Sequence, residues 1–326
     1  MEAIGGYFSL ELSKGEAYHP QAIALNTGRN CLEYIMRCRN YRKVYIPYYT
    51  CVVVADSFHK LDIPYEYYHI NEQLEIAEDI SLGSEEALLF TNYFGLKQTY
   101  VERLARQYGK QFIVDNTQAF YAKPIAGIDT FNTCRKFFGV PDGAYLYTDA
   151  KADFEIEQDV SYDRMSFLLK RLDLGAEAGY SDFQEQRINL IGLPIKRMSN
   201  LTTQMMKGID YQTVAQKRRE NYKYLHQHLA ETNQLLLELD EDAVPMVYPY
   251  LTKDEKLKQK LIDERIYVPT YWPDVLKWIG EKDFEYLLVQ SACFLPIDQR
   301  YGMEEMERII NVIKQHFLYG FAYPNR

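Results

Sequence analysis

A carboxylate and a lysine in the middle of the chain are the residues best suited to chemistry. Asp115 and Gln118 lie in the segment 114–118 (VDNTQ), and Lys136 ends the segment 130–136 (TFNTCRK), just before the glycine-bearing turn 137–144 (FFGVPDGA). A lysine that loses its proton near neutral pH is a nucleophile, and a buried carboxylate can keep a nitrogen protonated. The pair therefore indicates covalent carbonyl chemistry assisted by a charged partner.

These two residue types are the ones that pyridoxal 5'-phosphate (PLP) requires. In open α/β sheets, ligands lie outside the carboxyl ends of the strands, where the strand ending in Asp115 places its carboxylate. A carboxylate at the pyridine nitrogen keeps the ring protonated, and the ring then withdraws electron density from the substrate carbon. Lys136 would hold the cofactor as a Schiff base if desolvation or a nearby cation lowers its pKa. We therefore predict Lys136 as catalytic and Asp115 as cofactor-binding.

The same segments resemble the DegT-type sugar aminotransferases, which are PLP enzymes of the aspartate-aminotransferase-like fold. That family carries Asp-x-x-Gln at a strand end, then a hydroxyl residue, the Schiff-base lysine and an acid-glycine-small turn. Asp115 and Gln118 match the first pair, Lys136 matches the lysine, and residues 142–144 (DGA) match the turn. The resemblance implies that Gln118 contacts the phenolic-oxygen face of PLP and that Thr133, the hydroxyl residue, holds its phosphate.

Three further segments extend the resemblance over roughly the first two thirds of the chain. Residues 26–30 (NTGRN) stand where the family has its phosphate-binding Gly-Thr, which implies that Gly28 and Arg29 hold phosphate. Backbone N–H groups at a helix N-terminus favour a dianion, and an arginine adds a formal charge. Residues 47–50 (PYYT) resemble the turn before the ring-stacking residue. Residues 197–201 (RMSNL) resemble the segment that reaches toward the neighbouring subunit's site, so a homodimer is expected.

At four positions the sequence departs from the family pattern. The ring-stacking aromatic is replaced by Cys51, the cross-subunit asparagine by Ile195, the phosphate-side threonine by Arg29 and the serine before the lysine by Thr133. Arg29 is expected to compensate for lost phosphate contacts. Tyr93, in the segment 92–95 (NYFG), is expected to supply an alternative ring near the cofactor.

The elements that must position these residues alternate between strands and helices in the first half of the chain, as in βαβ units with a mainly parallel sheet. We predict strands at 44–47, 65–70, 87–91, 112–115 and 144–147, and helices at 29–39, 52–61 and 99–108. From about Gln212 the pattern changes to a long amphipathic helix, shorter strands and a final helix with one apolar face. These patterns, with the resemblance, predict an α/β protein of PLP fold type I. Residues 1–211 would form a large three-layer α/β/α domain and residues 212–326 a smaller α+β domain.

Composition excludes several classes of protein. The net charge is −9 and no basic cluster occurs, so no nucleic-acid partner is expected. No basic and apolar leader is present, and the most apolar run, 51–55, is too short to span a bilayer, so a cytoplasmic protein without a membrane partner is expected. The five cysteines form no Cys-x-x-Cys pair, which favours neither disulfides nor a metal site. Dinucleotide and P-loop motifs are also missing from the sequence.

Together these features predict a homodimeric PLP-dependent aminotransferase. The resemblance implies glutamate as amino donor and, as acceptor, a keto group such as that of a nucleotide-linked sugar. Lys136 would also move a proton between the substrate and the cofactor. Two alternatives stay open. One is a PLP enzyme that uses the same lysine for elimination or dehydration. The other is a non-catalytic protein that keeps the fold as a binding or assembly module, which the substitutions at Cys51 and Ile195 favour and the joint presence of Asp115 and Lys136 disfavours.

Overall fold

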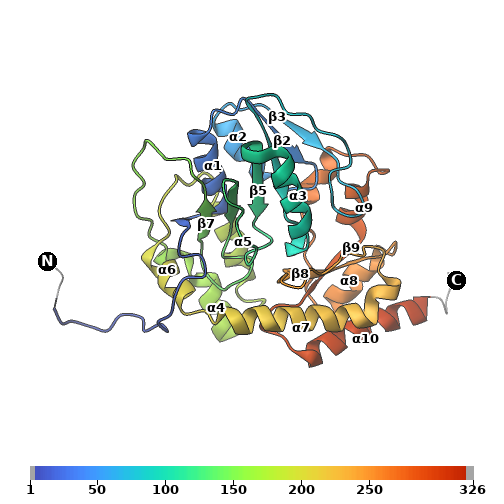
Figure 1. Ribbon diagram of the computed structural model, residues 1–326. Coiled ribbons are helices and arrows are strands. Elements are labelled where there is room, and N and C mark those ends of the chain that lie inside the picture. Colours follow the sequence, from blue (N-terminus) through green and yellow to red (C-terminus); the bar gives the residue numbers. More distant parts are fainter. Residues whose placement is uncertain (1–3, 321–326) are drawn as a thin grey trace.

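The computed structural model describes residues 4–320, and its central feature is a seven-stranded sheet (Figure 1). The strands lie in the order β1-β7-β6-β5-β4-β2-β3. Their bounds are β1 Ile23–Leu25, β2 Lys43–Pro47, β3 Tyr65–Tyr68, β4 Glu86–Thr91, β5 Phe112–Asn116, β6 Asp129–Asn132 and β7 Ala144–Tyr147. Strands β3, β2, β4, β5 and β6 pair in parallel, whereas β7 is antiparallel to both β6 and β1. The carboxyl ends of the parallel strands therefore meet at one edge.

Both faces of this sheet are buried, which explains why its central strands are almost continuously apolar. In β4, Leu88 and Phe90 enter one hydrophobic core, and Ala87 and Leu89 enter the other, as expected from the two-residue period of a strand. Helices α1 (Gly28–Cys38) and α2 (Val53–Lys60) cover one face. Helix α3 (Gln98–Tyr108) covers the opposite face (Figure 1). The result is the predicted three-layer arrangement.

The remaining helices lie after the sheet in sequence. They are α4 Ser166–Leu174, α5 Tyr180–Asn189, α6 Asn200–Lys207, α7 Tyr211–Leu229, α8 Lys256–Asp263, α9 Phe284–Ser291 and α10 Met303–Gly320. Strands β8 (Val247–Leu251) and β9 (Ala292–Pro296) form a two-stranded antiparallel sheet. Helix α7 extends to this small sheet and packs beside α10 (Figure 1). The fold class is confirmed, while the division into domains at residues 211 and 212 stays a prediction.

Most predicted elements of the first half are present with shifts of a residue or two at their ends, but β1 and β6 were not predicted. Strand β6 is central and yet reads DTFN. Its polar side chains have partners inside the protein, because Asp129 accepts two hydrogen bonds from Arg39 and Asn132 accepts one from the Tyr145 amide. The predicted strand 65–70 ends at Tyr68, beyond which Ile70 forms only an isolated bridge with Ile76.

Two further features of residues 4–320 are the state of the cysteines and the apolar length of the helices. All five cysteines fall within residues 4–320 and carry free thiols. Over the same residues, none of the helices combines the length and the apolar character needed to cross a bilayer.

Candidate active site

Lys136, Thr117 and Asp115 form a connected group at the carboxyl edge of the parallel strands. The Lys136 Nζ donates a hydrogen bond to Thr117 Oγ1 at 3.0 Å. The Thr117 backbone N–H in turn donates to the Asp115 carboxylate at 2.7 Å. Asp115 is the penultimate residue of β5 and is buried. The two residues predicted to do the chemistry are thus brought together through Thr117, which the sequence did not single out.

Burial shifts the pKa of both ionisable groups. It raises the pKa of Asp115, and the Lys136 charge and hydrogen bonds from Thr117 oppose this shift. It lowers the pKa of Lys136 against the attraction of Asp115. The Lys136 side chain is nevertheless exposed to solvent, so the surrounding protein atoms desolvate it only in part. An exposed amine with a lowered pKa beside a buried carboxylate has the properties of a reactive lysine.

The N-terminus of α1 lies against this group. Helix α1 begins at Gly28 after the N-cap Thr27, whose side chain accepts from the Asn30 amide at 3.1 Å. A Cβ atom at Gly28 would lie 3.3 Å from Thr117 Cγ2, so the glycine permits a close approach. The first helical hydrogen bond is donated by Cys31, which leaves the Gly28 and Arg29 amides without a partner in the helix. These amides are therefore available to an anion.

Three guanidinium groups gather near the same place. Burial lowers the pKa of Arg29, and the charge of Arg187 on α5 lowers it further. Burial likewise lowers the pKa of Arg135 to about 10, with contributions from Arg29 and Arg187. The Arg29 Nη1 is buried without a hydrogen-bond partner, and within residues 4–320 Arg135 has neither an ion pair nor a side-chain hydrogen bond. An anion would relieve this repulsion. Arg135 and Arg187 were not predicted.

Three other predicted cofactor-binding residues, Gln118, Thr133 and Tyr93, are buried, and they differ in whether their polar atoms already have hydrogen-bond partners. The Gln118 Oε1 accepts from the Phe94 amide at 3.1 Å, whereas its Nε2 is buried without a partner. The Thr133 hydroxyl donates to the Gly143 carbonyl at 3.3 Å. The Tyr93 hydroxyl donates to a backbone carbonyl at 2.9 Å, and its ring is covered by other protein atoms. Gln118 therefore keeps a free donor. The cofactor roles of Thr133 and Tyr93 stay predictions.

The two positions that depart most from the family pattern have distinct surroundings. Cys51 lies just before α2, is half-buried, and acts electrostatically on the pKa of both Arg29 and Lys136. Ile195 packs against the apolar core on the α1 face of the sheet. A methyl-rich side chain in that core cannot replace the hydrogen bonds of an asparagine.

Comparison with known proteins supports the fold through structure rather than sequence. No protein-family model and no curated protein matches the chain. Solved structures do match it, with identities of 13–16%. An aminotransferase TlmJ from Streptoalloteichus hindustanus is 14% identical, with 93% of this chain and 87% of that chain covered and a TM-score of 0.62. The PMP form of a sugar aminotransferase Spr1654 from Streptococcus pneumoniae is 13% identical, with 90% and 87% covered and a TM-score of 0.61. The protein ntda from Bacillus subtilis, with bound cofactor PMP, is 16% identical, with 90% and 73% covered and a TM-score of 0.62.

The fold is that of the sugar aminotransferases. The match to the sugar aminotransferase fold covers at least 90% of this chain in each of the three structures, so it includes most of residues 212–326, where the sequence resemblance was weakest. It confirms the predicted PLP fold type I.

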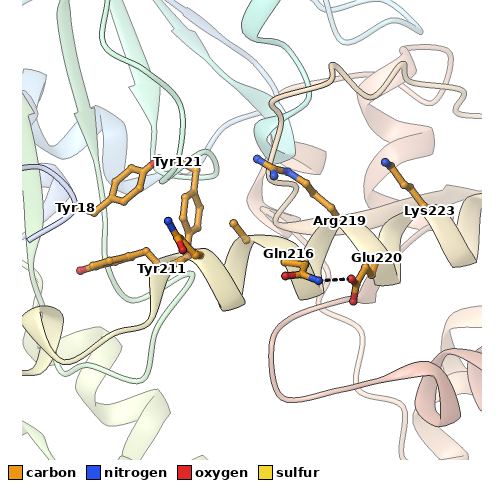
Figure 2. Close-up of a pocket in the computed structure, with 9 residues that line it drawn as sticks. Tyr18, Tyr121, Tyr211, Gln216, Arg219, Glu220 and Lys223 are labelled. Carbon is orange, nitrogen blue, oxygen red and sulfur yellow. Dashed lines mark hydrogen bonds between the residues drawn. The ribbon is translucent and has the colours of Figure 1, made fainter. Parts of the chain in front are cut away.

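A pocket of 550 Å³ beside α7 contains none of the predicted site residues (Figure 2). Its lining includes Tyr18, Tyr121, Tyr211, Gln216, Arg219 and Glu220. Figure 2 shows Gln216 donating to Glu220, and Arg219 donates to the backbone carbonyls of Ala243 and Asp242. Because the pocket does not include Lys136, Thr117 or Asp115, the group that these three residues form is the better candidate for catalysis.

Proposed function

We propose that this protein is a PLP-dependent aminotransferase that acts on a keto sugar. The observation that carries the proposal is the connection from Lys136 through Thr117 to buried Asp115, at the carboxyl edge of a parallel sheet in the sugar aminotransferase fold. An amine with a lowered pKa beside a buried carboxylate suits covalent catalysis at a carbonyl group.

The residues present fit PLP. Two buried donors without partners, Arg29 Nη1 and Gln118 Nε2, match the anionic and oxygen-bearing groups of this cofactor. Burial raises the pKa of Asp115 and thus disfavours its ionised form. A protonated ring nitrogen beside the carboxylate would counter this effect and stabilise the ionised form. When bound, PLP serves as an electron sink for the negative charge that develops at the substrate carbon.

In this proposal Lys136 has two roles at one atom. Its Nζ would hold the cofactor covalently, and as a free amine the same Nζ would accept and return the proton of the substrate carbon. Thr117 Oγ1, which accepts a hydrogen bond from this amine, would orient it. Asp115 would keep the ring nitrogen protonated, and Gln118 Nε2 would donate to a ring oxygen.

Phosphate binding is proposed for the start of α1. The Gly28 and Arg29 amides offer two donors, and the helix N-terminus favours negative charge. The guanidinium groups of Arg29 and Arg135 would neutralise a dianion whose charge relieves their mutual repulsion. We also propose Thr133 as a phosphate-side residue and Tyr93 as the ring that supports the cofactor.

The substrates are proposed from the neighbouring structures. Spr1654 is described as a sugar aminotransferase, and it and ntda were solved with PMP, the form of the cofactor that carries an amino group. We propose glutamate as amino donor and the keto group of a nucleotide-linked sugar as acceptor.

A homodimer is proposed from the surface of residues 160–191. Helices α4 and α5 pack on each other and still expose large apolar side chains, among them Leu169, Leu172, Leu174, Tyr180 and Ile188. We call this surface the α4–α5 face. The N-terminal stretch, which extends away from the sheet (Figure 1), adds exposed Tyr7 and Phe8. Exposed apolar groups at this density are typical of protein interfaces.

Two further proposals concern the compartment and the domains. The five free thiols support the cytoplasm as the compartment. We also propose that residues 1–211 and 212–326 form two domains.

The decisive experiment is reduction of the PLP-treated protein with borohydride, followed by peptide mapping. We expect the cofactor on Lys136 in the wild type and none at that position after Lys136→Ala, while Lys151→Ala, a change of an exposed lysine, leaves the labelling as in the wild type. In a separate, unreduced sample of the PLP-treated protein, addition of glutamate should convert the bound cofactor to its amine form and release 2-oxoglutarate. Absence of label on Lys136 would refute PLP catalysis. Labelling without conversion by glutamate, but with release of an elimination product from a substrate, would favour the lyase alternative.

A further inference from the structure

Arg218 on α7 is almost completely buried and has no carboxylate partner among residues 4–320. Asp298, a carboxylate that acts on the Arg218 pKa, is held by both Nε and Nη2 of Arg300, at 2.6 and 2.8 Å. The Arg218 guanidinium instead donates to backbone carbonyls, including that of Met246 at 3.0 Å. Burial lowers its pKa to about 10. A buried cation of this kind is costly, so its position needs an explanation.

Arg218 binds the backbone directly after Lys136, and this contact explains its position. Arg218 Nη2 donates to the Phe137 carbonyl at 3.3 Å, and Gln299 Nε2 donates to the same oxygen at 2.9 Å. The Arg218 guanidinium also lies 4.6 Å from the centre of the Phe137 ring. Two side chains from residues 212–326 therefore converge on one residue of the segment that carries the lysine.

Each of these two side chains, while donating to the Phe137 carbonyl, leaves one of its other polar atoms without a hydrogen bond. Within the described residues, Arg218 Nε and Gln299 Oε1 are buried and find no hydrogen-bond partner. Unsatisfied buried polar atoms are rare in folded proteins and call for a specific reason. Contact with the Phe137 carbonyl is the feature that the two side chains share.

The turn is also held by contacts other than those of Arg218 and Gln299. The Phe137 and Phe138 rings are buried, and Gln186 Nε2 donates to the Pro141 carbonyl at 3.2 Å. The amides of Phe137 and Phe138 both donate to the Cys134 carbonyl, at 3.1 and 3.0 Å, which closes the turn on its own N-terminal side. We propose that Arg218 and Gln299 are positioning residues, which fix the Phe137 peptide and thereby hold Lys136 Nζ at Thr117. The importance of this position for catalysis rests on the function proposed above.

A change in the titration of Lys136 would report a change in its position. The charged and titratable groups that act on its pKa are Asp115, Cys51 and Arg135, and desolvation is the largest cause of the shift. Replacement of Arg218 or Gln299 alters none of these three side chains. If the hold on Phe137 is lost, Lys136 Nζ can leave the protein atoms that desolvate it. Because desolvation is the largest cause of the shift, its pKa should then rise toward that of an ordinary lysine.

The test measures acetylation of Lys136 by acetic anhydride as a function of pH, in the full chain without PLP, with mass spectrometry of the Lys136 peptide. Two variants remove the grip, Arg218→Lys and Gln299→Ala. Arg219→Lys is the matched control, because Arg219 is the next residue of α7 and also donates to backbone carbonyls, but not to that of Phe137. We expect the pH midpoint of Lys136 acetylation to rise, and its rate at neutral pH to fall several-fold, in both variants and not in the control.

Thermal unfolding of each variant separates positioning from simple stabilisation. Lower melting temperatures with an unchanged acetylation midpoint in both variants would overturn the proposal, since Arg218 and Gln299 would then only stabilise the fold. If Arg218→Lys does not fold, the Gln299→Ala midpoint decides alone. Because the reagent is acetic anhydride, the result stands whether or not PLP attaches to Lys136, and failure of the proposed function would be seen separately in the borohydride experiment.

Discussion

The Lys136 amine lies 3.0 Å from the Thr117 hydroxyl, and Thr117 is also the residue whose amide binds the Asp115 carboxylate. One small side chain on the loop after β5 thus sets the separation between the proposed nucleophile and the proposed acid. Its hydroxyl can be removed with almost no change in volume, which makes it the most direct point at which to test the arrangement.

Thr117→Val should weaken the hold on Lys136 and lower the rate of cofactor attachment by about five- to tenfold, since a hydrogen bond of this kind contributes about 1–1.5 kcal/mol. Stopped-flow absorbance after addition of PLP measures this rate. Thr117→Ser keeps the hydroxyl and should stay near the wild-type rate. Equal losses in the two variants would show that the effect is not specific to the hydroxyl group.

Gly28→Ala should crowd Thr117, because the new Cβ would lie 3.3 Å from Thr117 Cγ2. Strain of about 1 kcal/mol or more implies at least about a fivefold weaker affinity for PLP. Equilibrium titration followed by absorbance gives the dissociation constant. Gly302→Ala, where the nearest atom is a side-chain oxygen at 3.9 Å, is the control. Unchanged PLP affinity in Gly28→Ala would remove the start of α1 from the site.

Arg29→Gln and Arg135→Gln should each reduce PLP affinity by about ten- to a hundredfold, the range for loss of a hydrogen bond to a charged group. Their affinity for pyridoxal, which lacks the phosphate, should not change. Parallel titrations with the two aldehydes make the comparison. An equal loss for both aldehydes would mean that the arginines shape the site without binding phosphate.

Leu172→Asp should convert the proposed dimer to monomer, because Leu172 is 83% exposed on the α4–α5 face and a carboxylate there would be desolvated on association. Sedimentation velocity over a range of concentrations measures the change. Leu318→Asp, at a comparably exposed leucine on α10, should leave the association unchanged. A wild-type protein that sediments as a monomer at all concentrations would contradict the proposed dimer.

His19 should make the protein sensitive to acid. Its ring is buried between the Tyr147 hydroxyl and the Phe120 carbonyl, each at 2.8 Å, and burial lowers its pKa to about 4. The folded state therefore binds fewer protons than the unfolded state between pH 6.5 and about 4, so stability falls as the pH falls through this window. The slope from this group is at most about 1.4 kcal/mol per pH unit.

Urea unfolding at several pH values measures that slope, and His19→Gln should reduce it. His59→Gln is the control, since His59 lies on the exposed end of α2. An identical pH dependence in His19→Gln and the wild type would show that His19 does not set the acid sensitivity.

The site residues that could be predicted are those that lie close to one another in the sequence. Asp115 and Gln118 follow an apolar strand, and Lys136 precedes a glycine turn, so type and spacing were enough to pair them. Thr117 was overlooked because its partner is a side chain 19 residues away. No sequence period specifies a contact of that kind.

The burial of Arg218 was even harder to predict from the sequence. It lies between Lys217 and Arg219, and such a run of cations normally indicates a solvated helix face. Its buried guanidinium donates to the carbonyls of Phe137 and of Met246, just before strand β8, and both come from distant segments. Strand β6 was missed for a related reason, since its Asp129 finds a guanidinium partner, Arg39, 90 residues earlier. Burial of polar groups is decided by such tertiary partners, which propensity does not encode.

The grip on the Phe137 carbonyl also has a consequence for the order in which the protein is made. Arg218 follows Phe137 by 81 residues and Gln299 follows it by 162. During synthesis the strands around Lys136 leave the ribosome first, and they can pair long before either donor exists. A nascent chain would therefore contain its reactive lysine before it contains the residues that position it, and the site would be completed only after Gln299 has been added.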